Sequence, residues 1–241
     1  MPSLVVHVVV TFVLSLLAAY GFLLLCCRRA GNPFGPRARA WAVLIVVATA
    51  AVSAALGLLL AAASHPSAAY LGLLVPSSLW LTTLAQRDPH LVPFGPLYDR
   101  MGDDMEDWCD TRLRAAAQKP QWIAAAANYY YDQVEARIRD ERARDELDEW
   151  RESIVHKIGV VRLIFAEAPA GEVRDALQTH PGTRDTRRYH DDDPARLAAR
   201  LESEALNELH LFLAYIYRLG YHKLLIYPFR PPAVQAQPEH V

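Results

Sequence analysis

Few residues of this sequence have the types and spacing that catalysis or metal binding requires. Glu152 and His156 are four residues apart and would share one helix face, where a carboxylate and an imidazole can bind a metal ion or move a proton. Glu208 and His210 are two residues apart and would not share a face. Di-iron helical bundles use a Glu-x-x-His spacing that neither pair has. A solvated polar face is the preferred interpretation, so Glu152 and His156 are weak candidates.

Three further groups carry reactive side chains. His190 precedes three aspartates, residues 191–193, which offer hard oxygen ligands in a loop whose end is already explained by helix capping. Cys26 and Cys27 can bind metal or oxidise, although unpaired cysteines usually serve packing. His7 stands inside an apolar run, where ionisable groups are usually functional or buried against a partner. His7 is therefore the third weak polar candidate.

The common catalytic and cofactor motifs are missing. The sequence has no phosphate-binding glycine loop, no His-Glu-x-x-His, no Cys-x-x-Cys and no Gly-x-Ser-x-Gly. We therefore expect no cofactor and no metal, and an enzyme is the less favoured class. The three cysteines are too few for a disulfide scaffold, and the net charge of −2 argues against a nucleic-acid binder.

Charge is distributed very unevenly along the 241 residues. Residues 1–85 contain no Asp, Glu or Lys and only four Arg, whereas residues 86–241 hold all 27 acidic residues and 21 basic ones. Water-soluble domains do not exclude charge over so long a stretch, because their surfaces need it. The sequence therefore predicts a transmembrane region over 1–86, followed by an acidic polar domain over 97–229.

Three apolar runs of the first region are the predicted spans. Residues 4–27 and 41–63 contain 24 and 23 residues, more than the roughly 20 that a helix needs to cross a bilayer. Residues 68–85 contain Pro76, which removes one backbone hydrogen bond that Ser77 and Ser78 can replace. We predict a third span over 68–85; a re-entrant or interfacial segment is the alternative.

The arginines predict the orientation. Residues 28–39 contain four Arg and no acid, whereas residues 64–67 carry no fixed charge. Because Lys and Arg are retained on the cytoplasmic side, the N-terminus is predicted outside the cell and the polar domain in the cytoplasm. If residues 68–85 do not span, the polar domain lies outside instead.

Small residues in the second run form a predicted helix-packing face. Ala51 and Ala55 are four residues apart, as are Ser53 and Gly57. Small residues at this spacing let helix backbones approach closely inside a membrane. The face is predicted to contact another span or a second copy of the chain.

The polar domain is predicted to be mainly helical. A break at Gly102 is followed by five acids, the pattern of a solvated helix entry. Helical periodicity begins at Lys119-Pro120, and the charged stretch 139–148 indicates one long projecting helix or two helices joined near Arg144. At least one ring of the three tyrosines at 129–131 is expected to face a partner or the membrane surface.

The end of the domain carries the clearest helix signals. Asp193 and Pro194 start a helix whose apolar face continues to a stop at Gly220. Residues 179–192 are predicted to form a loop and 230–241 a disordered tail. For Ile158 to Phe165 helix is favoured over strand, whereas Lys223 to Phe229 stays undecided. The fold class is mainly α, a three-span region before a helical domain, or α+β if both segments are strands.

Three functions are compatible with these features. The preferred hypothesis is a membrane-anchored interaction or accessory protein whose helical domain docks a protein partner, as in bacterial transfer or defence systems. The alternatives are a pore-forming or transport component assembled through its spans, and a membrane-bound metalloenzyme that uses Glu152 and His156. The expected partners are the lipid bilayer and either a protein or a second copy of the chain, with no nucleic acid. The richness in Ala and Arg is typical of high-GC bacterial coding.

Overall fold

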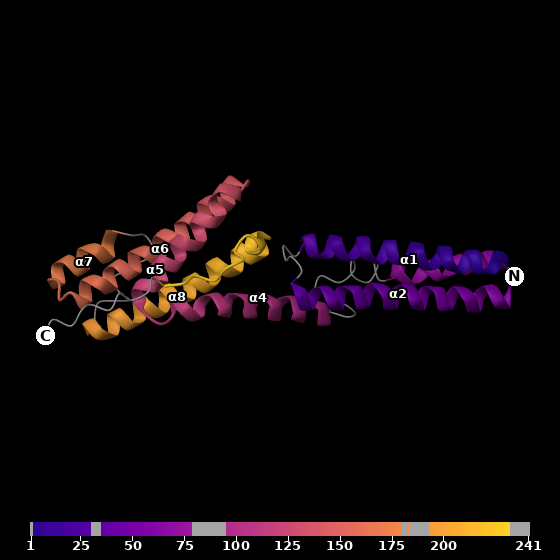
Figure 1. Cartoon of the computed structure of the whole chain (residues 1–241), viewed down its shortest axis with the longest axis horizontal. Helices are drawn as coiled ribbons and strands as arrows, with labels where there is room; N and C mark the ends of the chain where they lie inside the picture. Colours follow the sequence, from indigo (N-terminus) through magenta and orange to yellow (C-terminus); the bar gives the residue numbers. More distant parts are fainter. Residues whose placement is uncertain (1, 30–34, 79–94, 180–182, 184–192, 232–241) are drawn as a thin grey trace. The chain divides into compact units, whose positions relative to one another are not determined.

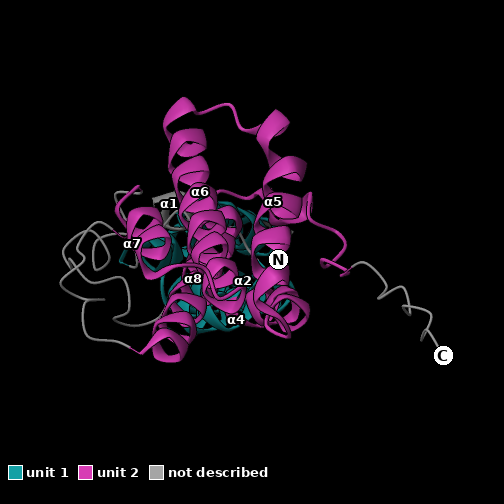
Figure 2. Cartoon of the chain, turned by 90° about the vertical axis from the view of Figure 1, so that its left-hand side faces the viewer, with its two compact units in different colours: residues 1–105 teal, residues 106–241 magenta. Residues whose placement is uncertain are grey.

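The computed structural model describes residues 2–29, 35–78, 95–179, 183 and 193–231. These residues form helices and turns, and none of them belongs to a strand. Figure 2 shows the division of the chain into two compact units, residues 1–105 (unit 1) and residues 106–241 (unit 2). The described part of the chain is therefore mainly α, as predicted.

Two long apolar helices form a hairpin in unit 1 (Figure 1). They are α1 (Pro2–Arg29) and α2 (Pro36–Ala63), and proline at the start of α2 costs no hydrogen bond. The stretches Leu4–Leu24 and Pro36–Ala63 are long and apolar enough to cross a membrane. Most of their large apolar side chains are exposed, an arrangement that lipid tolerates and water disfavours.

The third apolar run differs from the first two. It begins with η1 (Pro66–Leu73), an eight-residue 3-10 helix, and continues as α-helix over residues 74–78. Residues 79–85 lie outside the described ranges. Among the described residues two helices, not three, are long and apolar enough to cross a membrane, so the predicted span count is not confirmed.

The serines after Pro76 bond backbone carbonyls close to the proline. The Ser77 hydroxyl donates a hydrogen bond to the Leu73 carbonyl at 2.9 Å, and the Ser78 hydroxyl donates to the Val75 carbonyl at 2.7 Å. Backbone carbonyls near Pro76 therefore accept hydrogen bonds from serine side chains and need no water. An apolar environment requires such internal partners.

Small residues bring η1 into close contact with the α1–α2 hairpin. A Cβ atom on Gly57 would lie 2.5 Å from the Ala69 carbonyl oxygen, and one on Gly72 would overlap the Ser53 carbonyl oxygen. The Thr11 hydroxyl of α1 donates to the same Ala69 carbonyl at 3.2 Å. Side chains larger than hydrogen at residues 57 and 72 would hold these backbones apart.

The first turns of α4 (Gly95–Ala116) pack on the end of the hairpin where α2 begins. Leu97 and Met101 are buried in one cluster with Ala38 and Ala42 of α2. The helix passes through Gly102 without interruption, so the break predicted there is wrong. A single glycine costs a helix only about 1 kcal/mol, which the buried contacts of Leu97 and Met101 offset.

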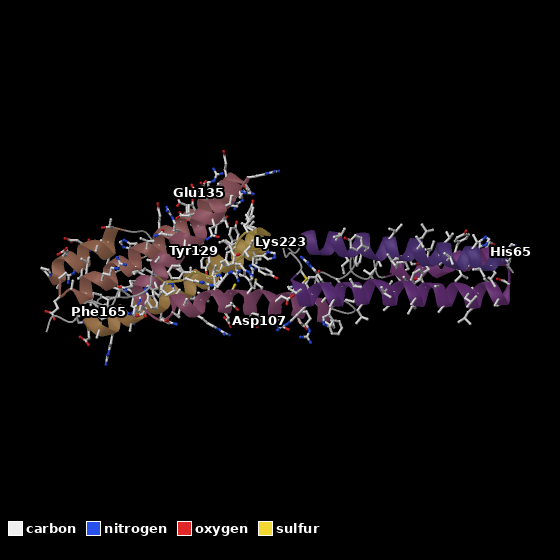
Figure 3. The ribbon with its side chains drawn as sticks, viewed as in Figure 1. His65, Asp107, Tyr129, Glu135, Phe165 and Lys223 are labelled. Atoms are coloured by element: carbon white, nitrogen blue, oxygen red, sulfur yellow. The ribbon has the colours of Figure 1, made fainter. Side chains whose placement is uncertain are left out.

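Unit 2 begins within α4 and continues with a helical hairpin of α5 (Pro120–Val134) and α6 (Glu141–Phe165), seen in Figure 2. The chain turns through η2 (Glu135–Arg137), and Figure 3 shows Glu135 at the tip. The Asp140 carboxylate then caps α6 by accepting a hydrogen bond from the Arg142 N–H at 3.0 Å. Of the two alternatives the chain therefore forms two helices. The turn comes earlier than predicted, since Arg144 lies inside α6.

Two of the three consecutive tyrosines face the interior of unit 2 and Tyr129 is half-buried, so the expectation of a ring directed at a partner or the membrane stays a prediction. Tyr130 and Tyr131 are buried. The ring of Tyr129 contacts those of Tyr130 and Phe229 at 5.2 and 5.8 Å between centroids. The C-terminal segment that carries Phe229 covers a face that the sequence alone leaves open.

The central element of unit 2 is α8 (Pro194–Arg218), which packs along α6, with α7 (Ala170–Thr179) beside them. Its start at Asp193-Pro194 is as predicted, and its predicted apolar face is buried as far as Ile216. Gly220 follows in the left-handed region with φ of 84°, which suits glycine and ends the helix.

The two segments left open between helix and strand have different structures. Ile158 to Phe165 is the last part of α6, so the favoured helix is confirmed. Lys223 to Phe229 is neither helix nor strand: after η5 (Tyr221–Lys223) the chain is irregular. Most of the predicted loop 179–192 and tail 230–241 lies outside the described residues.

Candidate functional site

The irregular segment Leu224 to Arg230, which we call the latch segment, is tied to the body of unit 2 at two backbone groups. The Arg112 guanidinium of α4 donates a hydrogen bond through Nη2 to the Leu225 carbonyl. The Tyr130 hydroxyl of α5 accepts a hydrogen bond from the Phe229 N–H at 2.8 Å. Leu225 and Phe229 are themselves buried. Two groups far away in the sequence thus define the course of the segment.

Arg112 is itself fixed by contacts with Trp108. Its guanidinium carbon lies 3.9 Å from the centroid of the Trp108 ring, and Nη1 donates to the Trp108 carbonyl at 3.3 Å. Burial lowers the pKa of Arg112, and Tyr130 and Cys109 act in the opposite direction. The cation is therefore balanced by an aromatic face and backbone carbonyls.

Tyr130 links α5 to α4 and to the latch segment. Its hydroxyl donates to the Arg112 carbonyl at 3.4 Å while it accepts from Phe229. Burial raises its pKa to about 12, partly offset by the hydrogen bond from Phe229 and by Arg112. At physiological pH the phenol is neutral and acts as donor and acceptor at once.

An aromatic cluster supports the chain just before the latch segment. The rings of Tyr217 and His222 are stacked with centroids 4.2 Å apart, and Trp108 meets them edge-on at 5.5 and 6.2 Å. Aromatic pairs in these geometries add roughly 0.5–1.5 kcal/mol beyond the area they bury. The turn after Gly220 is thus positioned by packing.

Between the two tied groups the latch segment exposes two apolar side chains. Ile226 is 70% exposed and Tyr227 is 67% exposed. The basic residues Lys223 and Arg230 flank them and are exposed as well. Residues 209–238 contain no Asp or Glu, although the chain as a whole is acidic. Unit 2 therefore presents a small apolar and aromatic surface with a basic rim. The backbone of this surface is hydrogen-bonded to Arg112 and Tyr130.

A second polar cluster lies between α6 and α8. The Lys157 ammonium contacts the Glu208 carboxylate and lies 3.3 Å from the Ser153 hydroxyl, which donates to the other Glu208 oxygen at 3.0 Å. The Lys157 side chain is only 4% exposed. Since the three groups bond one another inside a helix interface, the arrangement fixes the register of α6 on α8.

The predicted pair Glu152 and His156 does not converge on a common ligand. Glu152 is 62% exposed and lies 4.0 Å from the Arg151 guanidinium, whereas His156 Nε2 is 3.3 Å from the Thr183 hydroxyl. Nowhere in the described ranges do three or more His, Cys, Asp or Glu residues lie close enough to hold a metal ion. Glu208, which was not expected to share a face with His210, binds Lys157.

The candidates of the membrane region lie in unit 1. The His7 ring packs against that of Tyr70, with centroids 5.3 Å apart. Ser53 and Gly57 are buried against η1 of the same chain, whereas Ala51 and Ala55 are exposed. The small-residue spacing thus serves contact within the chain at one pair, and the other pair faces outward.

Sequence reasoning missed Arg112, the hydrogen bonds of Tyr130 and the Lys157 cluster. Ser153 and Lys157 had the i, i+4 spacing of a shared helix face, but their partner lies 51 residues beyond Lys157. The acid-free stretch 209–238 was a usable signal for the latch segment. No family model, no characterised protein and no solved structure matches this chain.

Proposed function

We propose that this chain is a membrane-anchored docking protein: unit 1 holds it in a bacterial cell membrane, and unit 2 presents the latch segment to a cytoplasmic protein. The observation that carries the proposal is the exposure of Ile226 and Tyr227 between two backbone groups that are tied to the core. The partner that fits is a protein surface with an apolar pocket and carboxylates around it.

A third crossing by the chain between α2 and α4 is supported by where the two helices end and begin. At 1.5 Å per residue, α2 is about 42 Å long, enough to cross a bilayer. It ends at Ala63, whereas α4 contacts its first turn at Ala38. The chain that leaves α2 at Ala63 must therefore return along the length of α2 before α4 contacts Ala38. This supports an odd number of crossings as part of the proposal, and α2 and η1 are in contact.

The orientation rests on the arginines. Residues 28–39, with four Arg and no acid, connect α1 and α2 at the end where α4 begins. That end faces the cytoplasm by the positive-inside rule, and the chain after it enters unit 2 on the same side. The N-terminus is then outside.

Docking of a protein is favoured over insertion into lipid by the size and fixation of the latch surface. Membrane binding scales with buried apolar area, and two side chains supply little of it. Protein interfaces, in contrast, obtain most of their free energy from a few fixed anchors, among which tyrosine is enriched. Because the segment is already ordered, association costs little further conformational entropy.

Site-specific photocrosslinking in living cells tests the docking proposal. A photoreactive phenylalanine analogue replaces Tyr227 in one full-length variant and Phe165 in another. The two side chains are 67% and 68% exposed, and Figure 3 shows Phe165 at the opposite end of unit 2 from Lys223. The comparison therefore separates the latch surface from exposure in general.

Docking predicts one discrete protein adduct from residue 227 and none from residue 165. Reversal of the rim charges by Lys223→Glu with Arg230→Glu should weaken that adduct, since the partner is expected to be acidic. Adducts with phospholipid alone at residue 227 would replace the proposal by membrane docking. Adducts of equal yield from both positions would refute a specific surface.

The orientation has its own test. Protease added to intact spheroplasts should leave unit 2 whole, and it should cleave unit 2 after the membrane is opened. Cleavage of unit 2 in intact spheroplasts would contradict the cytoplasmic placement while leaving the anchor itself in place.

A further inference from the structure

A groove of about 450 Å³ runs between α1 and α2 in unit 1. It is lined from α1 by Leu16, Tyr20 and Leu24 among others, and from α2 by residues that include Ala42, Val43 and Val47. The volume falls in the roughly 300–1,000 Å³ range of small-molecule sites. The lining is almost entirely apolar, so a hydrocarbon chain is the chemical match.

The groove is not filled by any described part of the chain. Residues of α1 and α2 that contact η1, such as Thr11, Ser53 and Gly57, do not line the groove. Tyr20, Leu24, Val43 and Val47 are all exposed along the groove. In a membrane this face of the hairpin therefore meets lipid.

Among the described residues that line the groove, Arg39 is the charged one. It lies in the first turn of α2, and no ion pair joins it to another residue in the described part of the chain. The connection that it ends, residues 28–39, contains four Arg and no acid. A guanidinium binds phosphate through two parallel N–H donors, which makes arginine the usual residue for this anion.

The length of the groove also matches a lipid. From Leu16 to Leu24 the groove follows α1 for about 12 Å at 1.5 Å per residue. One leaflet of the hydrocarbon core is about 15 Å thick, half of the roughly 30 Å total. Arg39 then lies near the headgroup level and Leu16 near the middle of the bilayer.

We propose that this groove binds an anionic phospholipid, with one acyl chain between α1 and α2 and the phosphate on Arg39. The proposal rests on the anchoring of α1 and α2 in a membrane. It predicts that the groove selects lipids by the charge of their headgroup. Lipids that merely surround a membrane helix need show no such selectivity. Basic pockets between membrane helices on the cytoplasmic side bind anionic headgroups for the same physical reason.

The test is retention of lipid by the full-length protein in detergent. The protein is incubated with equal amounts of phosphatidylglycerol and phosphatidylcholine with identical acyl chains, and native mass spectrometry counts each bound lipid. We expect a preference for phosphatidylglycerol of about 5-fold, the value of one interfacial cation. Arg39→Gln should bring the ratio close to 1.

Two further variants separate binding from general charge and from the apolar groove. Arg37→Gln removes a charge two residues away that does not line the groove, so it should leave the ratio unchanged. Val43→Trp fills the groove at an exposed position and should lower retention of both lipids. Thermal unfolding of each variant verifies that unit 1 is intact.

The outcomes distinguish this proposal from the anchoring itself. Equal retention of both lipids by the wild type, or an equal effect of Arg37→Gln and Arg39→Gln, would overturn the lipid site and leave the anchor standing. A full-length chain that stays in solution without detergent would overturn the anchor.

Discussion

The Asp104 carboxylate accepts a hydrogen bond from the Ala38 backbone N–H at 2.9 Å, across 66 residues of sequence. Ala38 is in the first turn of α2, where backbone N–H groups have no partner within the helix. The acid thus serves as a helix cap supplied by α4. Through this bond the N-terminal half of α4 is attached to the end of the hairpin that carries the arginines.

Replacement of this cap should loosen unit 1. Asp104→Ala removes a buried acceptor and should lower the stability of unit 1 by about 1 kcal/mol, the usual value of a helix cap. Thermal unfolding of the full-length protein in detergent measures the effect. Asp103→Ala is the matched control, because Asp103 is an exposed neighbour that forms an ion pair with Arg100, at 3.4 Å. Equal effects of both substitutions would show that the Ala38 bond contributes nothing.

Asp104 also marks the boundary of what the sequence alone predicts. Periodicity and composition predict the helices of both units, because burial of an apolar face repeats at helical spacing within each helix. They place Asp104 among five acids at a solvated helix entry, since nothing local indicates that one of them reaches Ala38. The same holds for Glu208 and Arg112, whose partners lie 51 and 113 residues away. Long-range polar contacts depend on the tertiary fold.

The close packing of η1 can be tested at its two glycines. Gly72→Leu should displace η1 from α2, because the new side chain would overlap the Ser53 carbonyl. We expect a loss of roughly 1–3 kcal/mol, typical of overpacking, seen as a lower unfolding temperature in detergent. Gly57→Ala should have a smaller effect of the same sign.

Gly21 supplies the control for these substitutions. A Cβ atom there meets no other heavy atom within 4 Å, so Gly21→Ala should be neutral or slightly stabilising in a helix. If Gly72→Leu unfolds at the same temperature as the wild type, the third apolar run does not pack on α2 as described.

The Lys157 cluster should contribute strongly to unit 2 when one partner is removed and little when both are replaced. Lys157→Met leaves the Glu208 carboxylate without its cation, and we expect about 3 kcal/mol of destabilisation. Lys157→Met with Glu208→Leu replaces the pair by apolar groups and should recover most of that loss. Hydrogen exchange of α6 and α8 in the full-length protein reports both, free of any contribution from unit 1.

Recovery in the double variant is the decisive comparison. A double variant as unstable as the sum of the two single variants would mean that the ion pair has no coupling energy. Arg142, which pairs with Glu146 on the exposed surface at 3.4 Å, is the control, and Arg142→Met should change exchange little.

Burial of Cys109 predicts the alkaline behaviour of unit 2. Burial raises its pKa from 9.0 to about 12, although nearby Arg112 acts in the opposite direction. The folded state therefore binds the thiol proton more tightly than the unfolded state. The resulting stability is fully present below pH 9 and is lost as the pH rises from 9 towards 12. Cys109→Ala should make the decline of stability between pH 9 and 11 less steep in urea unfolding.

The same burial predicts that Cys109 resists alkylation. In a Cys26→Ser, Cys27→Ser background, iodoacetamide at pH 8 should leave the folded chain unmodified and should label it once urea is added, because only the thiolate reacts. Rapid labelling of the folded chain at pH 8 would show that the thiol is accessible or ionised.

The last prediction concerns Arg112, which acts on the docking surface through the latch segment. Arg112→Lys keeps the charge but loses the planar donors that bond the Leu225 and Trp108 carbonyls together. We expect hydrogen exchange of residues 224–230 to rise at least tenfold, which corresponds to about 1.4 kcal/mol, while α6 stays protected. Arg114→Lys on the exposed side of α4 is the control and should change nothing. Because Ile226 and Tyr227 would then be ordered only on binding, the photocrosslink at residue 227 should also weaken. Faster exchange without a weaker crosslink would show that docking does not need a preformed segment.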